Sequence, residues 1–127
     1  MAKIKSVSAL TCYVKDLNKT ADFYEKLGFN FRKREANQVT VNMNWFWIDF
    51  LPIDKESKSE FMAEAKAEPK GAGLYVYVSV DDVDEYYNEI MAKGLKPSSE
   101  PRDWPWGNRE FVLRDPDGYK LVFFKRK

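Results

Sequence analysis

The amino-acid sequence predicts an α+β fold in which two βαβββ modules form one domain, with curved mixed sheets that enclose a cleft. Two observations support this prediction: a repeated strand–helix–glycine pattern, and strands in which apolar side chains alternate with others. A chain of 127 residues suits one core rather than two independent cores. We therefore expect a single domain over 1–127, with module one at about 5–53, a linker at about 54–73 and module two at about 74–127.

The repeat is visible when two segments are compared directly. The matching positions are Val14, Asp16, Leu17 and Gly28 in the first copy, and Val80, Asp82, Val83 and Gly94 in the second. The Asp and the Gly are equally far apart in both copies. An Asp suits a helix N-cap because its carboxylate accepts backbone N–H bonds, and a Gly suits the helix end because it adopts the left-handed conformation at little cost. Each copy therefore predicts a helix between its Asp and its Gly.

Each predicted helix follows an alternating strand. In the strand at 9–14, one face carries Leu, Cys and Val, and in the strand at 74–80 leucine and valine alternate with Tyr75, Tyr77 and Ser79. The aliphatic faces suit packing under the helices, because one face of a half-buried sheet is apolar. We expect the opposite faces to turn toward the cleft.

Further β-like sequence follows each helix. The expected strands are 29–34, 38–43 and 46–52 in module one, and 109–114 and 119–125 in module two. A tight turn is expected at Asn44-Trp45, and another at Asp115-Pro116-Asp117-Gly118, where Pro presets φ and Gly permits a positive φ. Within the charged linker, 59–67 can form a helical turn.

Composition narrows the possible partners and location. The formal net charge is +1, so nothing favours binding to nucleic acid or to an anionic membrane surface. No apolar run approaches the ~20 residues that cross a bilayer. The first residues lack the apolar stretch of a signal peptide, and a single cysteine, Cys12, fits a reducing compartment. We therefore expect a cytoplasmic protein.

Several motifs of the chain resemble those of the vicinal oxygen chelate superfamily, which includes glyoxalases, bleomycin-resistance proteins and extradiol dioxygenases. They are Tyr13–Leu17, Phe23–Phe29, Val80–Asp84 and Arg114–Gly118, together with the loop Pro101–Gly107, which is similar to that of bleomycin-resistance-like members. Each motif alone is weak, but together they span nearly the whole chain in the family's order. The resemblance implies the paired βαβββ fold and a homodimer, and it is much less specific for function.

The resemblance also implies four metal-ligand positions. In this chain they hold Ala9, Asp49, Tyr75 and Val122, and the chain contains no histidine. Ala and Val have no donor atom, a tyrosine with a pKa near 10 is an uncommon ligand, and a lone aspartate cannot hold a transition metal tightly. We therefore expect no metal and no other cofactor, as in the metal-free bleomycin-resistance-like members.

Aromatic residues are the main candidates for ligand contact. Such side chains either line a cleft that stacks on a flat molecule or fill the core of a small domain. For Phe50 and Phe124 both roles are open, whereas Trp104 and Trp106 lie in a Pro-rich loop that suits contact with a ligand or a dimer partner. The aromatic set also contains Trp45. The predicted ligand-binding residues are Trp47, Asp49, Tyr75, Tyr77, Trp104, Trp106 and Phe124.

Three charged residues and the cysteine leave alternatives open. Asp49, within an aromatic run, could contact a cationic ligand, pair with a base such as Lys120, or be solvated on a strand. Arg109 and Glu110 fit a solvated face better than a pocket mouth. Cys12 has no histidine partner and is expected to be a small buried apolar residue.

These features predict metal-independent binding of a small aromatic or drug-like molecule, with sequestration similar to that by bleomycin-resistance proteins. The alternative is a glyoxalase- or dioxygenase-type enzyme, that is, a lyase, isomerase or oxygenase, which would require a divalent metal. A metal-free isomerase or lyase with Asp49, Glu110 or a tyrosine as base is a third hypothesis. Open strand edges, and a cleft in so short a chain, favour a homodimer.

Overall fold

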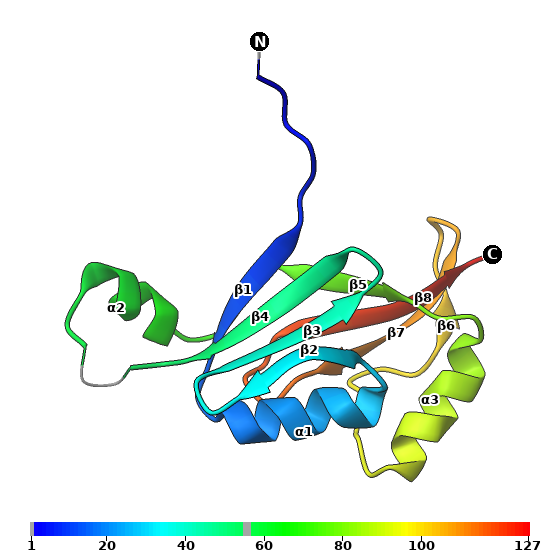
Figure 1. The fold of residues 1–127 in the computed structure, drawn as a ribbon. Coiled ribbons are helices and arrows are strands. Elements are labelled where there is room, and N and C mark those ends of the chain that lie inside the picture. The colour runs from blue at the N-terminus through cyan, green and yellow to red at the C-terminus, as the bar shows by residue number, and fades with distance from the viewer. Residues whose placement is uncertain (1, 55–56) are drawn as a thin grey trace. The chain divides into compact units, whose positions relative to one another are not determined.

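The computed structural model describes residues 2–54 and 57–127 and divides into two compact units, Met1–Ala67 (unit one) and Glu68–Lys127 (unit two). The boundary falls inside the linker predicted at 54–73, of which residues 55–56 lie outside the described residues. Each unit contains one four-stranded mixed sheet and a helix that packs on it (Figure 1).

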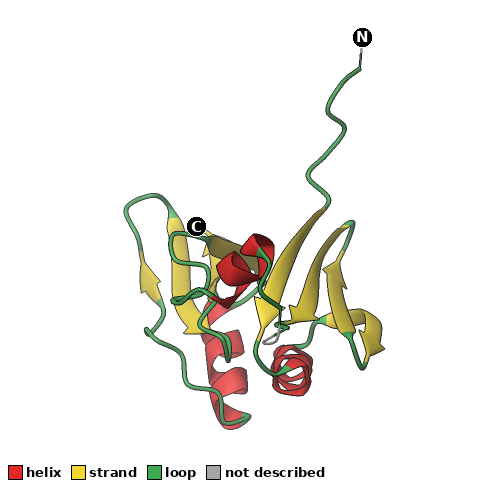
Figure 2. Ribbon diagram, turned by 90° about the vertical axis from the view of Figure 1, so that its left-hand side faces the viewer, coloured by secondary structure: helices red, strands yellow, loops and turns green. Residues whose placement is uncertain are grey.

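Unit one has the predicted βαβββ order. Its elements are β1 (Ala9–Val14), α1 (Leu17–Leu27), β2 (Asn30–Glu35), β3 (Gln38–Met43), β4 (Phe46–Pro52) and α2 (Glu60–Lys66). The strand order is β1-β4-β3-β2, so that β4 returns to lie parallel to β1 while the other neighbours are antiparallel. Figure 2 shows the strands in yellow and the helices in red, with a loop leading into β1.

Unit two repeats this topology. Its elements are β5 (Tyr75–Ser79), α3 (Val83–Ala92), β6 (Arg102–Asp103), β7 (Asn108–Arg114) and β8 (Lys120–Arg126). The order β5-β8-β7-β6 again places the first and last strands side by side and parallel. The two βαβββ modules confirm the predicted fold class. The short β6 lies in a segment that we expected to be a loop, because two residues are too few to show alternation.

The repeated Asp and Gly have the predicted capping roles. Asp16 accepts the backbone N–H of Lys19 at 3.1 Å, and the equivalent Asp82 accepts the N–H three residues further on at 3.0 Å. Gly28 and Gly94 have φ of 93° and 88°, which is the left-handed region that side chains avoid. None of the helices within 2–54 and 57–127 is long and apolar enough to cross a membrane.

The two predicted turns are also present. Asn44 has a φ of 56° in the turn that joins β3 to β4. In the second turn the carboxylate of Asp115 accepts backbone N–H bonds from Asp117 at 3.0 Å and Tyr119 at 2.9 Å. These bonds hold β7 and β8 in one register, which positions the side chains of the sheet.

The core of each unit lies between its sheet and its helix. In unit one, α1 packs on β3 and β4, and Tyr24 lies 4.7 Å from Phe50 between ring centroids. Phe50 is fully buried, so it belongs to the core, and Cys12 is buried as expected. In unit two, α3 packs on β7 and β8, where the rings of Phe111 and Phe123 stack at 5.3 Å. The buried face of each sheet is therefore the one that the alternation predicts to pack under the helix, although Leu74 at the start of the second strand pattern is 43% exposed.

Candidate functional site

The sheet of unit two has one face that points away from α3, which we call the open face. It consists of Tyr75, Tyr77 and Ser79 of β5, Lys120, Val122, Phe124 and Arg126 of β8, Asn108, Glu110, Val112 and Arg114 of β7, and Arg102 of β6. These residues share a face because side chains alternate along each strand and the register aligns them across strands. The intervening residues of β7 and β8, such as Phe111 and Phe123, pack against α3.

Aromatic side chains are exposed on the open face. Tyr75 is 52% exposed and Tyr77 is 49% exposed. The ring of Tyr77 meets that of the half-buried Phe124 edge to face, with centroids 5.5 Å apart. Of the two roles expected for Phe124, the structure therefore supports a place on the open face, whereas Phe50 is a core residue.

Two tryptophans extend this aromatic surface from the loop between β6 and β7. The rings of Trp104 and Trp106 stack at 4.7 Å with an angle of 12° between their planes. The loop closes because the N–H of Gly107 donates to the carbonyl of Trp104 at 3.1 Å. Trp106 is 56% exposed. The guanidinium of Arg102 lies 3.7 Å from the centre of the Trp104 ring, where the electron-rich face attracts a cation.

Glu110 lies beneath these aromatic residues, and the expectation that it belongs to a solvated face is wrong. Its side chain is buried rather than part of a solvated face, and its Oε2 accepts hydrogen bonds from Trp106 Nε1 at 3.3 Å and Asn108 Nδ2 at 3.1 Å. Burial and the neighbouring charge of Glu110, with a smaller effect of Tyr75, raise the pKa of Tyr77. The Tyr77 hydroxyl is therefore neutral at physiological pH and is a hydrogen-bond donor.

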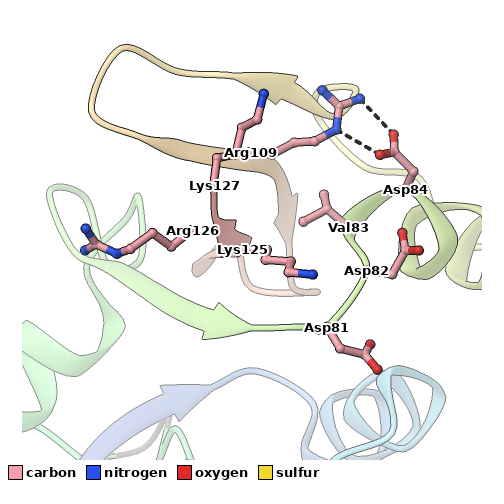
Figure 3. Close-up of a pocket in the computed structure, with 8 residues that line it drawn as sticks. All are labelled: Asp81, Asp82, Val83, Asp84, Arg109, Lys125, Arg126 and Lys127. Atoms are coloured by element: carbon pink, nitrogen blue, oxygen red, sulfur yellow. Dashed lines mark hydrogen bonds and ion pairs between the residues drawn. The ribbon is translucent and has the colours of Figure 1, made fainter.

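Arg109, the residue before Glu110, lies on the opposite face and forms ion pairs. Its Nε and Nη2 contact both carboxylate oxygens of Asp84 at 2.8 Å (Figure 3). Its Nη1 contacts Asp103 at 3.1 Å. The hydrogen bond from Arg109 lowers the pKa of Asp84, and the contacts of Lys127 and then Arg109 lower that of Asp103. These ion pairs join α3 to β7 and β6.

The same ion pairs border a pocket of about 430 Å³ at the start of α3. Its lining residues are Asp81, Asp82, Val83, Asp84, Arg109, Lys125, Arg126 and Lys127 (Figure 3). Asp82 is used as the helix cap and Asp84 pairs with Arg109, so much of the acidic charge is already engaged. The pocket contains no aromatic side chain and none of the residues predicted to bind a ligand.

Two of the predicted ligand-binding residues lie in unit one. Trp47 and Asp49 share the face of β4 that points away from α1. The Asp49 carboxylate accepts hydrogen bonds from Thr40 Oγ1 at 2.6 Å and Gln38 Nε2 at 3.2 Å, which offsets the cost of its partial burial. Arg32 lies 4.9 Å from the Trp47 ring. The other five predicted residues are all in unit two.

Arg102 and Lys120 are additional candidates beside the predicted aromatic residues. The Lys120 Nζ lies 3.9 Å from the centre of the Tyr75 ring. Both cations could have been found by alternation, because Lys120 lies two residues before Val122 and Arg102 two residues before Trp104. For Glu110 the alternation indicates the face but not the burial.

The donor set does not fit a metal of the kind that the resemblance implies. Within the described ranges 2–54 and 57–127 there is no group of three or more His, Cys, Asp or Glu side chains placed to hold a metal ion. Of the four family positions only Asp49 has a carboxylate, and that carboxylate is hydrogen-bonded to Thr40 and Gln38. A Lewis-acid step therefore has no suitable donor set in this part of the chain.

The paired βαβββ modules define a class of small α+β proteins, and comparison with known proteins identifies the family. The chain belongs to the Glyoxalase/Bleomycin resistance protein/Dioxygenase superfamily, whose family model matches residues 6–123. It is 28% identical to a bleomycin resistance protein of Geobacillus stearothermophilus over 132 residues, which cover 97% of each chain. It is 26% identical to a bleomycin resistance protein of Klebsiella pneumoniae over 114 residues, which cover 84% of this chain and 82% of the relative.

Solved structures agree on the fold. A glyoxalase/bleomycin resistance protein/dioxygenase from Nocardioides superimposes with a TM-score of 0.80 at 21% identity, and the match covers 99% of this chain and 86% of the other. A hypothetical protein from Staphylococcus aureus superimposes with a TM-score of 0.77 at 20% identity, covering 97% and 94%. At these identities the likeness describes the fold alone.

Proposed function

We propose that this protein binds a small aromatic or drug-like molecule on the open face, without a metal, and acts by sequestering it. The observation that carries the proposal is the group of exposed rings of Tyr75, Tyr77 and Trp106 on one face of unit two. Clustered apolar surface on a soluble protein is unfavourable in water, and a flat ligand that covers it gains stacking and burial energy.

The relatives support the same proposal. Several are named bleomycin resistance proteins, and the match to that of Geobacillus stearothermophilus extends over 97% of both chains. Sequestration requires affinity rather than catalytic groups, which suits a chain without histidine. The net charge of +1 offers little attraction to a polycationic drug, so the ligand need not be bleomycin itself.

The available bases fit catalysis less well than binding. Glu110 is buried and accepts hydrogen bonds from Trp106 and Asn108, so it is poorly placed to take a proton from a substrate. The raised pKa of Tyr77 makes its deprotonated form scarcer near neutral pH. These properties argue against the metal-free isomerase or lyase, and the donor set argues against the metal-dependent enzyme.

We further propose that the protein acts as a cytoplasmic homodimer, and that Trp47 and Asp49 give unit one a ligand contact of its own. The sheet of each unit has two edge strands, β1 and β2 in unit one and β5 and β6 in unit two. Edge strands can pair with a second copy. Sedimentation velocity measures the dimer directly, and a monomer at all concentrations would contradict it. Replacing Trp47 by Leu is the matching test for ligand contact in unit one.

The proposed function is tested by calorimetric titration of the full chain with 2-naphthol and with metal-free bleomycin in the presence of EDTA. We expect 2-naphthol to bind with EDTA present, and Tyr77→Ala to weaken it by about tenfold, which is the effect of losing one stacked ring. Trp45→Ala is the control, because Trp45 is 78% exposed in the turn of unit one. Binding of neither probe, or equal losses in the two variants, would contradict the proposal.

A further inference from the structure

We propose that the ligand of the open face is a planar aromatic anion, an inference that rests on the proposed function and specifies its ligand class. Two properties of the open face support this inference. Its accessible charges are positive, and they lie on either side of an apolar row.

The accessible charges of the open face are positive. They belong to Arg102, Arg114 and Lys120, whereas Glu110 is the one carboxylate among the residues that define this face. The carboxylates of α3 and its cap, including Asp84, lie on the helix side, where Arg109 pairs with Asp84. On the open face the cations therefore have no accessible carboxylate of that face beside them, whereas on the helix side Arg109 and Lys127 are paired with Asp84 and Asp103.

The positive charges flank an apolar row. In the register of the sheet, Tyr77, Val122 and Val112 lie side by side in the middle of the open face. Lys120 lies in the neighbouring row on one side of this apolar row. Arg102 lies in the neighbouring row on the other side. Val122 is buried, so the exposed side chain of this row is that of Tyr77. Rows on one face of a sheet are about 7 Å apart, so a molecule of one or two fused rings that stacks on Tyr77 spans the distance to a cation in a neighbouring row.

The contacts of the two nearest cations keep their charge available. Arg102 lies 3.7 Å from the Trp104 ring and Lys120 lies 3.9 Å from the Tyr75 ring. A ring orients a cation without neutralising its charge, so a carboxylate or sulfonate can still pair with it. Arg109 and Lys127 of unit two, by contrast, form ion pairs with Asp84 and Asp103.

The single carboxylate is poorly placed to attract a cationic ligand. Glu110 is 5% exposed, and its Oε2 is held by Trp106 and Asn108. A second copy is also a poor occupant, because face-to-face packing around a two-fold axis would oppose like charges. An aromatic anion can stack on the exposed rings and form an ion pair with the cations beside them.

The test compares three probes of one shape: 2-naphthoate, 2-naphthol and 2-naphthylmethylammonium, titrated into the full chain by calorimetry. We expect 2-naphthoate to bind about tenfold tighter than the ammonium probe, and the difference to shrink as salt is added. We expect Lys120→Met to weaken 2-naphthoate by about fivefold to tenfold and 2-naphthol by less than about twofold. Arg102→Gln is the second variant and should weaken 2-naphthoate in the same way.

Lys125→Met is the matched control. Lys125 belongs to the same strand β8 and carries the same charge, but it lines the pocket on the opposite face. We expect it to leave the affinity for 2-naphthoate unchanged. Equal losses in Lys120→Met and Lys125→Met would overturn the proposal, because a general effect of net charge would then explain the binding.

The other outcomes separate this inference from the proposed function. Binding of the ammonium probe as tightly as 2-naphthoate would overturn the anionic ligand class while the proposed function still held. Failure of all three probes to bind would overturn both. A lowered sedimentation coefficient of the Lys120→Met variant would identify the open face as an interface between copies, and that result would also overturn the proposal.

Discussion

Units one and two share one framework but carry different surfaces. In unit one, Thr11 of β1, Asp49 of β4 and Thr40 of β3 lie side by side in register on the face away from α1. The equivalent row of unit two contains Tyr77, Val122 and Val112. The first row is polar and internally hydrogen-bonded through Asp49, whereas the second is apolar and leads to exposed aromatic rings.

The residues under the helices differ much less. Phe50 of β4 and Phe123 of β8 occupy equivalent positions, and both are fully buried beneath α1 and α3 respectively. The face under the helix is similar in the two units because a buried aromatic side chain has few substitutes of the same volume. The residues of the opposite face do not have this constraint, and they differ between the units. A polar surface in one copy and an aromatic surface in the other are compatible with the same register.

The largest expected effect tests the shared framework. Phe50→Ala and Phe123→Ala should each lower the free energy of unfolding by about 3–5 kcal/mol, because each removes a fully buried ring and leaves a cavity. Urea denaturation followed by circular dichroism measures the loss. A loss below about 1 kcal/mol in either variant would show that the two cores are not equivalent.

A smaller effect tests a difference between the two helices. Thr20 of α1 is fully buried, and its Oγ1 has no hydrogen-bond partner among the described residues. The equivalent position in α3 is Tyr86, whose ring packs 4.9 Å from Phe123. Thr20→Val should raise the free energy of unfolding by about 1 kcal/mol, because it removes an unsatisfied buried hydroxyl and keeps the shape.

The control for this prediction is Thr20→Ser, which keeps the hydroxyl and removes the methyl group. It should lower the stability, and thermal denaturation should rank the valine variant above the original chain and the serine variant below it. A valine variant less stable than the original would indicate that the Thr20 hydroxyl contributes a bond that stabilises α1.

The smallest effect concerns the stability of unit two at high pH. Burial, with a smaller effect of Glu89, raises the pKa of Tyr86 above the ordinary value near 10. Below pH 10 the phenol is protonated in both the folded and the unfolded chain, and its contribution is complete. As the pH rises above 10 the unfolded chain loses this proton first, so stability should fall. Tyr86→Phe should flatten that decline in urea titrations between pH 9 and about 11, and an unchanged slope would contradict it.

Much of the framework could be predicted from the sequence because its signals are local. The Asp caps, the glycines at the helix ends and the turn at Asp115 each depend on a few neighbouring residues, and all are present. Strand alternation likewise indicated which faces pack under the helices. The strand β6 was missed because its two residues lie between Pro101 and the tryptophan loop and show no period.

The candidate site was harder to predict because it depends on contacts across strands. Glu110 is buried and accepts a hydrogen bond from Trp106, which precedes it by four residues in the loop between β6 and β7. The positions of Arg102 and Lys120 over aromatic rings likewise depend on side-chain orientation. Alternation places such residues on a face, but it does not determine which of them are covered.

The most direct test of the central claim, that the open face of unit two binds the ligand, is chemical-shift mapping of backbone amides during titration with 2-naphthol. We predict the largest changes at Tyr77, at Phe124 and in the loop 104–107. Changes concentrated instead around Asp81–Asp84, where the pocket of about 430 Å³ lies on the helix side, would contradict it.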